Sequence, residues 1–170
     1  ARFELTVHNR TPAKAAELVA EGATMVVSPA EVASQTSVVI TMLPGPAEVR
    51  AVVTGEDGVL AGARPGTLVV DMSTSAPALA RELAERARSG GVGMLDAPVS
   101  GGPEGAEAGT LSIMVGGEPA DVERARPVLE VLGSTVTHVG GHGAGQVVKA
   151  CNQIVVALII QAVSEALVLG

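Results

Sequence analysis

The chain has 170 residues with a net charge of −7, and 47% of them are hydrophobic although Trp and Tyr are absent and Phe occurs once. This length suits one domain with an aliphatic core, and the acidic balance excludes a nucleic-acid partner because no basic surface is available to meet phosphates. With a single Cys and no secretory leader evident, we expect a reducing, cytoplasmic setting.

Strand and helix signals alternate along the chain with short connections. Strands are predicted at residues 3–8, 24–27, 37–42, 67–71, 94–98, 111–115 and 135–139. Helices are predicted at residues 12–22, from residue 29, at 47–53, 75–89 and 121–132, and as one long helix from about residue 143 onward. A glycine-rich loop is expected over residues 100–109. Such alternation builds crossover units, so we predict an α/β fold with a mostly parallel, doubly wound sheet.

The longest apolar stretch, residues 154–169, is interrupted by Gln161, Ser164 and Glu165. It falls short of the about 20 apolar residues of a membrane span, so we expect no membrane association. A helix that is apolar nearly all round is instead typical of one buried between domains or subunits. Both ends of the sequence interrupt secondary structure, which predicts an interior segment of a longer protein.

The segment Asn9–Thr11 follows the first predicted strand and precedes a helix that begins at Pro12. Ligands of parallel sheets bind where the carboxyl ends of the strands open into a crevice. In dinucleotide-binding folds an acid at such a position binds the free ribose 2′-hydroxyl, whereas an Arg accommodates a 2′-phosphate. Arg10 is present and the acid is missing, which favours NADP over NAD. A solvated Arg beside an N-cap Thr is the alternative.

The loop that follows the strand at 94–98 contains Ser100, Gly101 and Gly102. Two glycines allow close approach of backbone N–H groups to a ligand, and the Ser hydroxyl adds a third neutral donor, a set that suits a carboxylate. An ordinary glycine turn is the alternative. A serine-hydrolase elbow is excluded because Pro98 stands where that motif needs its first glycine.

Three polar side chains share one face of the long, otherwise apolar helix: Lys149, Asn152 and Gln153, at positions i, i+3 and i+4. A Lys on a largely buried helix is costly unless it has a partner or a chemical task. The alternative is a Lys that reaches solvent, with the amides as contacts between helices. His138 and His142 flank a glycine turn with no Cys nearby, so no metal site is predicted.

The ordered set of motifs resembles the β-hydroxyacid dehydrogenase family over essentially the whole chain. The motifs are Thr41–Pro44, Asp71–Thr74, Asp96–Gly102, Gly109–Leu111, Met114–Gly117 and Gly143–Asn152. The resemblance implies a Rossmann-type sheet that lacks its first strand and G-x-G-x-x-G loop. Residues 1–140 would form this partial NAD(P)-binding domain. Residues 141–170 would begin an interdomain helix that leads to an absent, all-helical C-terminal domain.

The resemblance also implies an oxidoreductase that transfers hydride between NAD(P)H and a small carboxylate-bearing aldehyde or hydroxyacid, and that forms a homo-oligomer. The implied catalytic residues are Lys149 as general acid and Asn152. The predicted substrate-binding residues are Ser100, Gly101, Gly102, Asn152 and Gln153. The predicted dinucleotide-binding residues are Asn9, Arg10, Thr11, Met42, Leu43, Pro44, Glu48, Ser73, Thr74 and Val99, with NADP as the cofactor and NAD as the alternative.

The helix over residues 149–153 is most similar to that of the tartronate semialdehyde reductases, which implies reduction of this semialdehyde to glycerate. Gln153 stands where many relatives carry a second Asn, which disfavours 3-hydroxyisobutyrate as substrate. The alternatives are a 3-hydroxyisobutyrate dehydrogenase, an NADPH-dependent glyoxylate or succinic semialdehyde reductase, a non-catalytic ligand-binding relative, and an inactive fragment.

Overall fold

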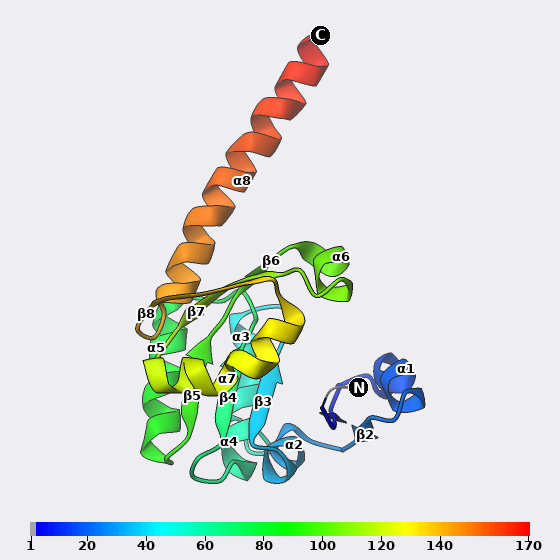
Figure 1. Ribbon diagram of the computed structural model, residues 1–170, viewed down its shortest axis with the longest axis vertical. Coiled ribbons are helices and arrows are strands. Elements are labelled where there is room, and N and C mark those ends of the chain that lie inside the picture. The colour runs from blue at the N-terminus through cyan, green and yellow to red at the C-terminus, as the bar shows by residue number, and fades with distance from the viewer. Residues whose placement is uncertain (1–2) are drawn as a thin grey trace.

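A six-stranded mixed sheet forms the centre of the protein in the computed structural model, which describes residues 3–170 (Figure 1). Its strands are β3 (Val38–Thr41), β4 (Leu68–Asp71), β5 (Gly93–Asp96), β6 (Val99–Ser100), β7 (Ser112–Gly116) and β8 (Thr135–Gly140). The order across the sheet is β3-β4-β5-β7-β6, and β8 pairs with β7. Strands β3, β4 and β5 are parallel and in register, so the ends of β4 and β5 pair Asp71 with Asp96.

Strand β7 runs antiparallel to β5 and β6 and parallel to β8. Strand β7 changes direction because of the segment before it. Residues 100–109, which were expected to form a glycine-rich loop, contain the end of β6 and the short helix α6 (Gly102–Glu107), and they return the chain in the opposite direction. The prediction of a continuous loop there was wrong. Glycines favour turns, whereas Pro103 favours a helix start and lies in the first turn of α6.

The helices cover both faces of the sheet. They are η1 (Pro12–Ala15), α1 (Ala16–Ala20), α2 (Pro29–Gln35), α3 (Pro46–Thr54), α4 (Val59–Gly62), α5 (Pro77–Ser89), α6, α7 (Pro119–Leu132) and α8 (Ala144–Leu169). Alternate residues of β4 enter two separate cores: Val69 packs with Val49 of α3 and Leu83 of α5, and Val70 packs in the other core with Leu129 of α7. This two-sided burial explains the apolar strand runs in the sequence.

The N-terminal segment forms a separate two-stranded parallel sheet, β1 (Thr6–Val7) and β2 (Thr24–Met25). The helix predicted over 12–22 is divided into η1 and α1. The Thr11 side chain makes no cap hydrogen bond at the start of η1, and the Thr11 backbone N–H donates to Asn9 Oδ1 at 2.9 Å. This local turn places Arg10 at the exposed end of β1.

Helix α8 begins within the domain and then extends well beyond it (Figure 1). Its first turns contact β5, β7 and β8. From Cys151 onward its side chains are exposed, apart from a half-buried Asn152. Although α8 is long and apolar enough to span a membrane by length and composition, its first turns hold a buried Gln and Lys bonded to the sheet end, which favours a helix of a folded domain.

Candidate active site

The start of α8 is held by a carboxylate at the end of β5. Asp96 is only 2% exposed, and its two oxygens accept different backbone N–H groups: Oδ1 from Gly143 at 2.7 Å and Oδ2 from Gln146 at 3.0 Å. A negative group at a helix N-terminus satisfies unpaired N–H donors and interacts favourably with the positive end of the helix dipole. Burial raises the pKa of the Asp96 carboxyl, while these N–H donors act to lower it.

Glycines allow this close docking. A Cβ on Gly145 would lie 2.7 Å from the Asp96 carbonyl oxygen, and one on Gly116 would lie 2.8 Å from the Gly145 nitrogen. No ordinary side chain fits at either position without displacing backbone. The glycines before the long helix therefore bring its first turn against β5 and β7.

Lys149 is 8% exposed and lies in the second turn of α8. Its ammonium donates to Ser100 Oγ at 3.0 Å, and the Asn152 amide donates to the same oxygen at 3.2 Å. Burial lowers the pKa of Lys149, because desolvation disfavours the ammonium form. With two donors at its oxygen, the Ser100 hydroxyl has its own hydrogen available for a further acceptor. The structure thus joins three of the predicted site residues.

The rest of the predicted carboxylate site lies next to Ser100. Gly101 and Gly102 have φ angles of +134° and +65°, a region that favours glycine. Both are exposed, and α6 begins at Gly102. Gln153 is exposed, and its Oε1 accepts from the Asn152 amide at 3.3 Å. Gln153 thus contacts Asn152, which in turn contacts Ser100.

Most of the predicted dinucleotide-binding residues lie at the carboxyl ends of strands or in the turns after them, whereas Glu48 lies in α3 and Val99 begins β6. Asn9, Arg10, Thr11, Met42, Pro44, Glu48 and Thr74 are exposed, Leu43 and Val99 are half-buried, and Ser73 is buried. Met42 is 65% exposed, which is unusual for a large apolar side chain directly after a buried strand. The exposed Met42 side chain can pack against the flat ring of a ligand, and the exposed Arg10 guanidinium after β1 can bind a phosphate.

A buried polar chain connects the loops after β3 and β4. Asp71 Oδ1 accepts from the Thr41 hydroxyl at 2.8 Å and from the Ser73 N–H at 3.2 Å, and the Ser73 hydroxyl accepts from the Leu43 N–H at 2.9 Å. Burial raises the pKa of Asp71, against the effect of these hydrogen bonds. Ser73 thus connects the loops after β3 and β4 by hydrogen bonds. Thr74 is the one residue of the Asp71–Thr74 motif that is exposed.

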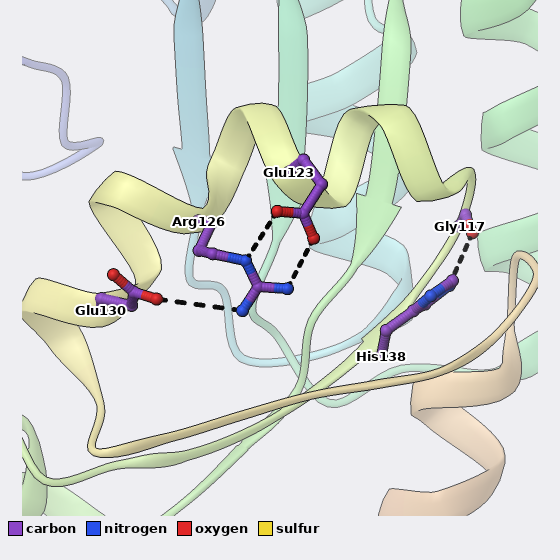
Figure 2. A network of polar contacts seen from close by, with 5 residues as sticks. All are labelled: Gly117, Glu123, Arg126, Glu130 and His138. Atoms are coloured by element: carbon purple, nitrogen blue, oxygen red, sulfur yellow. Dashed lines mark hydrogen bonds and ion pairs between the residues drawn. The ribbon is translucent and has the colours of Figure 1, made fainter.

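The two histidines of the last strand and turn bind backbone carbonyls. His138 Nε2 lies 3.0 Å from the Gly117 oxygen and 2.9 Å from the Gly140 oxygen, and His142 Nε2 lies 3.0 Å from the Met94 oxygen. Carbonyls only accept, so Nε2 carries the hydrogen in both rings. Figure 2 shows His138 pointing to Gly117 beside an ion-paired Arg126 on α7. Among residues 3–170, no three His, Cys, Asp or Glu side chains are placed to hold a metal ion.

Two residues that the sequence analysis gave no role stand out here. Asp96 enters the sequence analysis only as the start of a motif, and Gln146 only as part of the segment Gly143–Asn152. The signal for Gln146 was available, since it precedes Lys149 by three positions and so shares its helix face. The signal for Asp96 was weaker, because an acid after a strand does not reveal a helix that is distant in the sequence.

Comparison with known proteins agrees with this arrangement. Residues 1–140 match the family described as the NAD binding domain of 6-phosphogluconate dehydrogenase. The chain is 44% identical over 170 residues to 3-hydroxyisobutyrate dehydrogenase of Pseudomonas aeruginosa, covering 100% of this chain and 57% of that protein. It is 45% identical over 151 residues to 2-hydroxy-3-oxopropionate reductase of Escherichia coli, covering 89% of this chain and 52% of that protein.

A solved structure gives the same result. The Mycobacterium tuberculosis 3-hydroxyisobutyrate dehydrogenase, described with L-serine, superposes with a TM-score of 0.88 at 46% identity, covering 94% of this chain and 54% of that one. The chain belongs to the β-hydroxyacid dehydrogenase family, and the predicted Rossmann-type α/β fold is confirmed. It spans about half the length of the curated relatives that it matches.

Proposed function

We propose that the protein containing this chain is an NAD(P)-dependent oxidoreductase that reduces a small carboxylate-bearing aldehyde, or oxidises the corresponding β-hydroxyacid. The observation that carries the proposal is the buried Lys149 ammonium bound to Ser100 at 3.0 Å. A buried lysine with a lowered pKa and no carboxylate partner among its described hydrogen bonds is typical of a proton donor.

Each residue of the site has a distinct task in this proposal. The Ser100 hydroxyl and the N–H groups of Gly101 and Gly102 bind the substrate carboxylate. When bound, the cofactor supplies the hydride for the carbonyl carbon. The carbonyl oxygen then gains negative charge, and the Lys149 ammonium stabilises this charge and donates a proton to form the hydroxyl. The resulting neutral amine regains a proton from water. Asn152 orients Lys149 and Ser100 through its contact with the same Oγ.

The cofactor we propose is NADP. Arg10 is exposed at the end of β1, and the Asn9–Thr11 turn contains no carboxylate that would repel a 2′-phosphate. Met42, Pro44 and Thr74 would line the remainder of the dinucleotide site. NAD is the alternative, because an Arg at this position accommodates the phosphate without excluding the free hydroxyl.

The substrate we propose is tartronate semialdehyde, with glycerate as product. Relatives with two different named substrates are almost equally similar to the chain, at 44% and 45% identity, so overall similarity does not separate them. Gln153 is the basis for proposing the semialdehyde, because it stands where many relatives carry a second Asn and its Oε1 accepts from the Asn152 amide.

Steady-state rates test the proposal directly. The full-length protein would be assayed with tartronate semialdehyde, glyoxylate, succinic semialdehyde and, in the oxidative direction, 3-hydroxyisobutyrate, each with both nicotinamide cofactors. We expect the highest kcat/KM with tartronate semialdehyde and NADPH. A folded protein that binds NADPH and turns over none of these substrates would favour a non-catalytic ligand-binding relative instead.

A further inference from the structure

Gln146 lies on α8 one turn before Lys149, and its side chain is 1% exposed. Its Nε2 donates to the Ser73 carbonyl at 2.8 Å, and its Oε1 accepts from the Ser75 N–H at 2.9 Å. These two backbone groups lie on either side of Thr74, an exposed residue at the carboxyl end of β4. One side-chain amide therefore fixes the β4 loop at both flanks of a predicted cofactor contact.

The backbone of Gln146 is fixed from a different direction. Its N–H donates to Asp96 Oδ2 at 3.0 Å, at the end of β5. Four residues further along the same segment, Ser100 accepts from Lys149 at 3.0 Å. Gln146 is thus the point at which the β4 loop, the β5 segment and α8 are joined by hydrogen bonds.

We propose, on the basis of the function proposed above, that Gln146 is a positioning residue that fixes the β4 loop relative to the Lys149 ammonium. Hydride and proton must reach the two atoms of one carbonyl bond, so the element that faces the cofactor and the element that carries the proton donor need a constant separation. A misplacement of about 1 Å can lower a rate about 100-fold. Both Oε1 and Nε2 of the Gln146 side chain face backbone partners, an orientation that apolar packing alone does not require.

Gln146→Met is the direct test in the full-length protein, because Met has a similar length and retains the packing but forms neither hydrogen bond. We expect kcat to fall about 10- to 100-fold, while KM for the aldehyde and the dissociation constant of NADPH stay within about threefold. In the cofactor-free protein, amide hydrogen exchange at Ser75 should become faster, because its N–H loses its acceptor.

Ser75→Ala is the matched control. This variant retains the backbone N–H that donates to Gln146 Oε1. It removes only the Ser75 hydroxyl, which is buried and has no hydrogen-bond partner among the described residues. We expect its kcat and its exchange rates to stay within about twofold of wild type, since an unpaired buried hydroxyl contributes no stabilising bond.

Gln146→Glu provides an independent test that does not depend on how Met packs. A protonated Glu accepts from the Ser75 N–H through its carbonyl and donates through its O–H to the Ser73 carbonyl, as Gln does, whereas the ionised form cannot donate. The titratable and charged groups on the elements packed against this part of α8 include Asp71 on β4, Arg81 on α5, Asp96 on β5, His142 before α8 and Lys149 on it, and all five are present in both proteins. The kcat of Gln146→Glu relative to wild type at the same pH should therefore rise as pH falls.

The outcomes separate this inference from the proposed function. An inactive wild-type protein contradicts the proposed function, and the exchange rate at Ser75 still decides whether Gln146 holds the loop. With an active wild type, a folded Gln146→Met protein with unchanged kcat overturns the positioning role alone. If Gln146→Met does not fold, a ratio for Gln146→Glu that is flat with pH overturns it equally.

Discussion

Asp71 and Asp96 end two neighbouring parallel strands in direct register, yet they use their carboxylates in different ways. Asp71 accepts from the Thr41 hydroxyl and from the Ser73 backbone N–H at the single atom Oδ1. Asp96 accepts one backbone N–H at each oxygen, from Gly143 and Gln146. An amide in place of the carboxylate can therefore reproduce the first arrangement but not the second.

Asp71→Asn should leave the free energy of unfolding at pH 7 unchanged or increase it. Burial raises the pKa of the Asp71 carboxyl above its value of about 3.9 in the unfolded chain. The contribution of Asp71 to stability is therefore fully present below a pH of about 3.9, and it is lost as the pH rises through the pKa of the folded state. The amide oxygen retains both hydrogen bonds without a buried charge. Urea unfolding from pH 4 to pH 7 should show a smaller loss of stability with rising pH than in wild type.

Asp96→Asn is the matched comparison and should behave differently. One of the two N–H donors at the start of α8 would face an amide NH₂ group in place of an oxygen. We expect a loss of about 1–3 kcal/mol at pH 7 for the unpaired buried donor, together with reduced activity because the helix that carries Lys149 is loosened. Equal effects of the two substitutions on unfolding would contradict the roles assigned to the individual oxygens.

Gly145→Ala tests how closely α8 must approach the sheet. A Cβ at this position would meet the Asp96 carbonyl oxygen at 2.7 Å, so the helix has to shift away. We expect a loss of about 1–3 kcal/mol in unfolding free energy from overpacking, with kcat reduced. Gly141→Ala is the control, since its Cβ would have no neighbour within 4 Å and its φ is not positive. Thermal unfolding of both variants provides the measurement.

Much of this architecture was predictable because the sequence encodes it locally. The apolar run at residues 67–71 and the proline-started helices define strand and helix without reference to the rest of the chain. The reversal at β7 was not predictable from alternation, because it depends on how the short α6 returns the chain. Within the site, Lys149, Asn152 and Ser100 were each proposed from residue type and position. Their shared hydrogen bonds at Ser100 Oγ join residues 49 and 52 positions apart, a pairing that only the fold determines.

Arg10→Asp should change the choice of cofactor. If Arg10 binds the 2′-phosphate, its replacement by an acid should raise the dissociation constant of NADPH by at least about 10-fold, the effect expected from the loss of about 1.5–3 kcal/mol for a charged hydrogen bond. Binding of NADH should weaken much less. Lys14→Asp makes the same charge change on the adjacent η1 and serves as the control. Equal weakening of both cofactors in Arg10→Asp would remove the 2′-phosphate role.

Ser100→Ala tests the carboxylate site. The hydroxyl of Ser100 has its oxygen occupied by Lys149 and Asn152, so its hydrogen is free for the substrate. Loss of one hydrogen bond to a charged group should raise KM by the equivalent of about 1.5–3 kcal/mol. An amide analogue of the substrate should react poorly even with wild type. If the analogue reacts as well as the acid, this loop has a different task.

Lys149→Ala should lower kcat about 10²- to 10⁴-fold, the usual contribution of a general acid, while the affinity for NADPH stays nearly unchanged. Lys149→Arg should restore little, because a guanidinium stays protonated and presents a different geometry. Burial lowers the pKa of Lys149, and reduction needs the ammonium, so the wild-type rate of reduction should fall with rising pH at a lower pH than for a solvated lysine. Lys14→Ala, at an exposed lysine, should leave both the rate and its pH profile unchanged.

A purely structural role for Lys149 predicts instead a lower Tm for Lys149→Ala, weaker NADPH binding and activity lost in proportion to folded protein. A Lys149→Ala protein that folds, binds NADPH and turns over within about threefold of wild type, well inside the loss expected for a general acid, would exclude Lys149 as the proton donor.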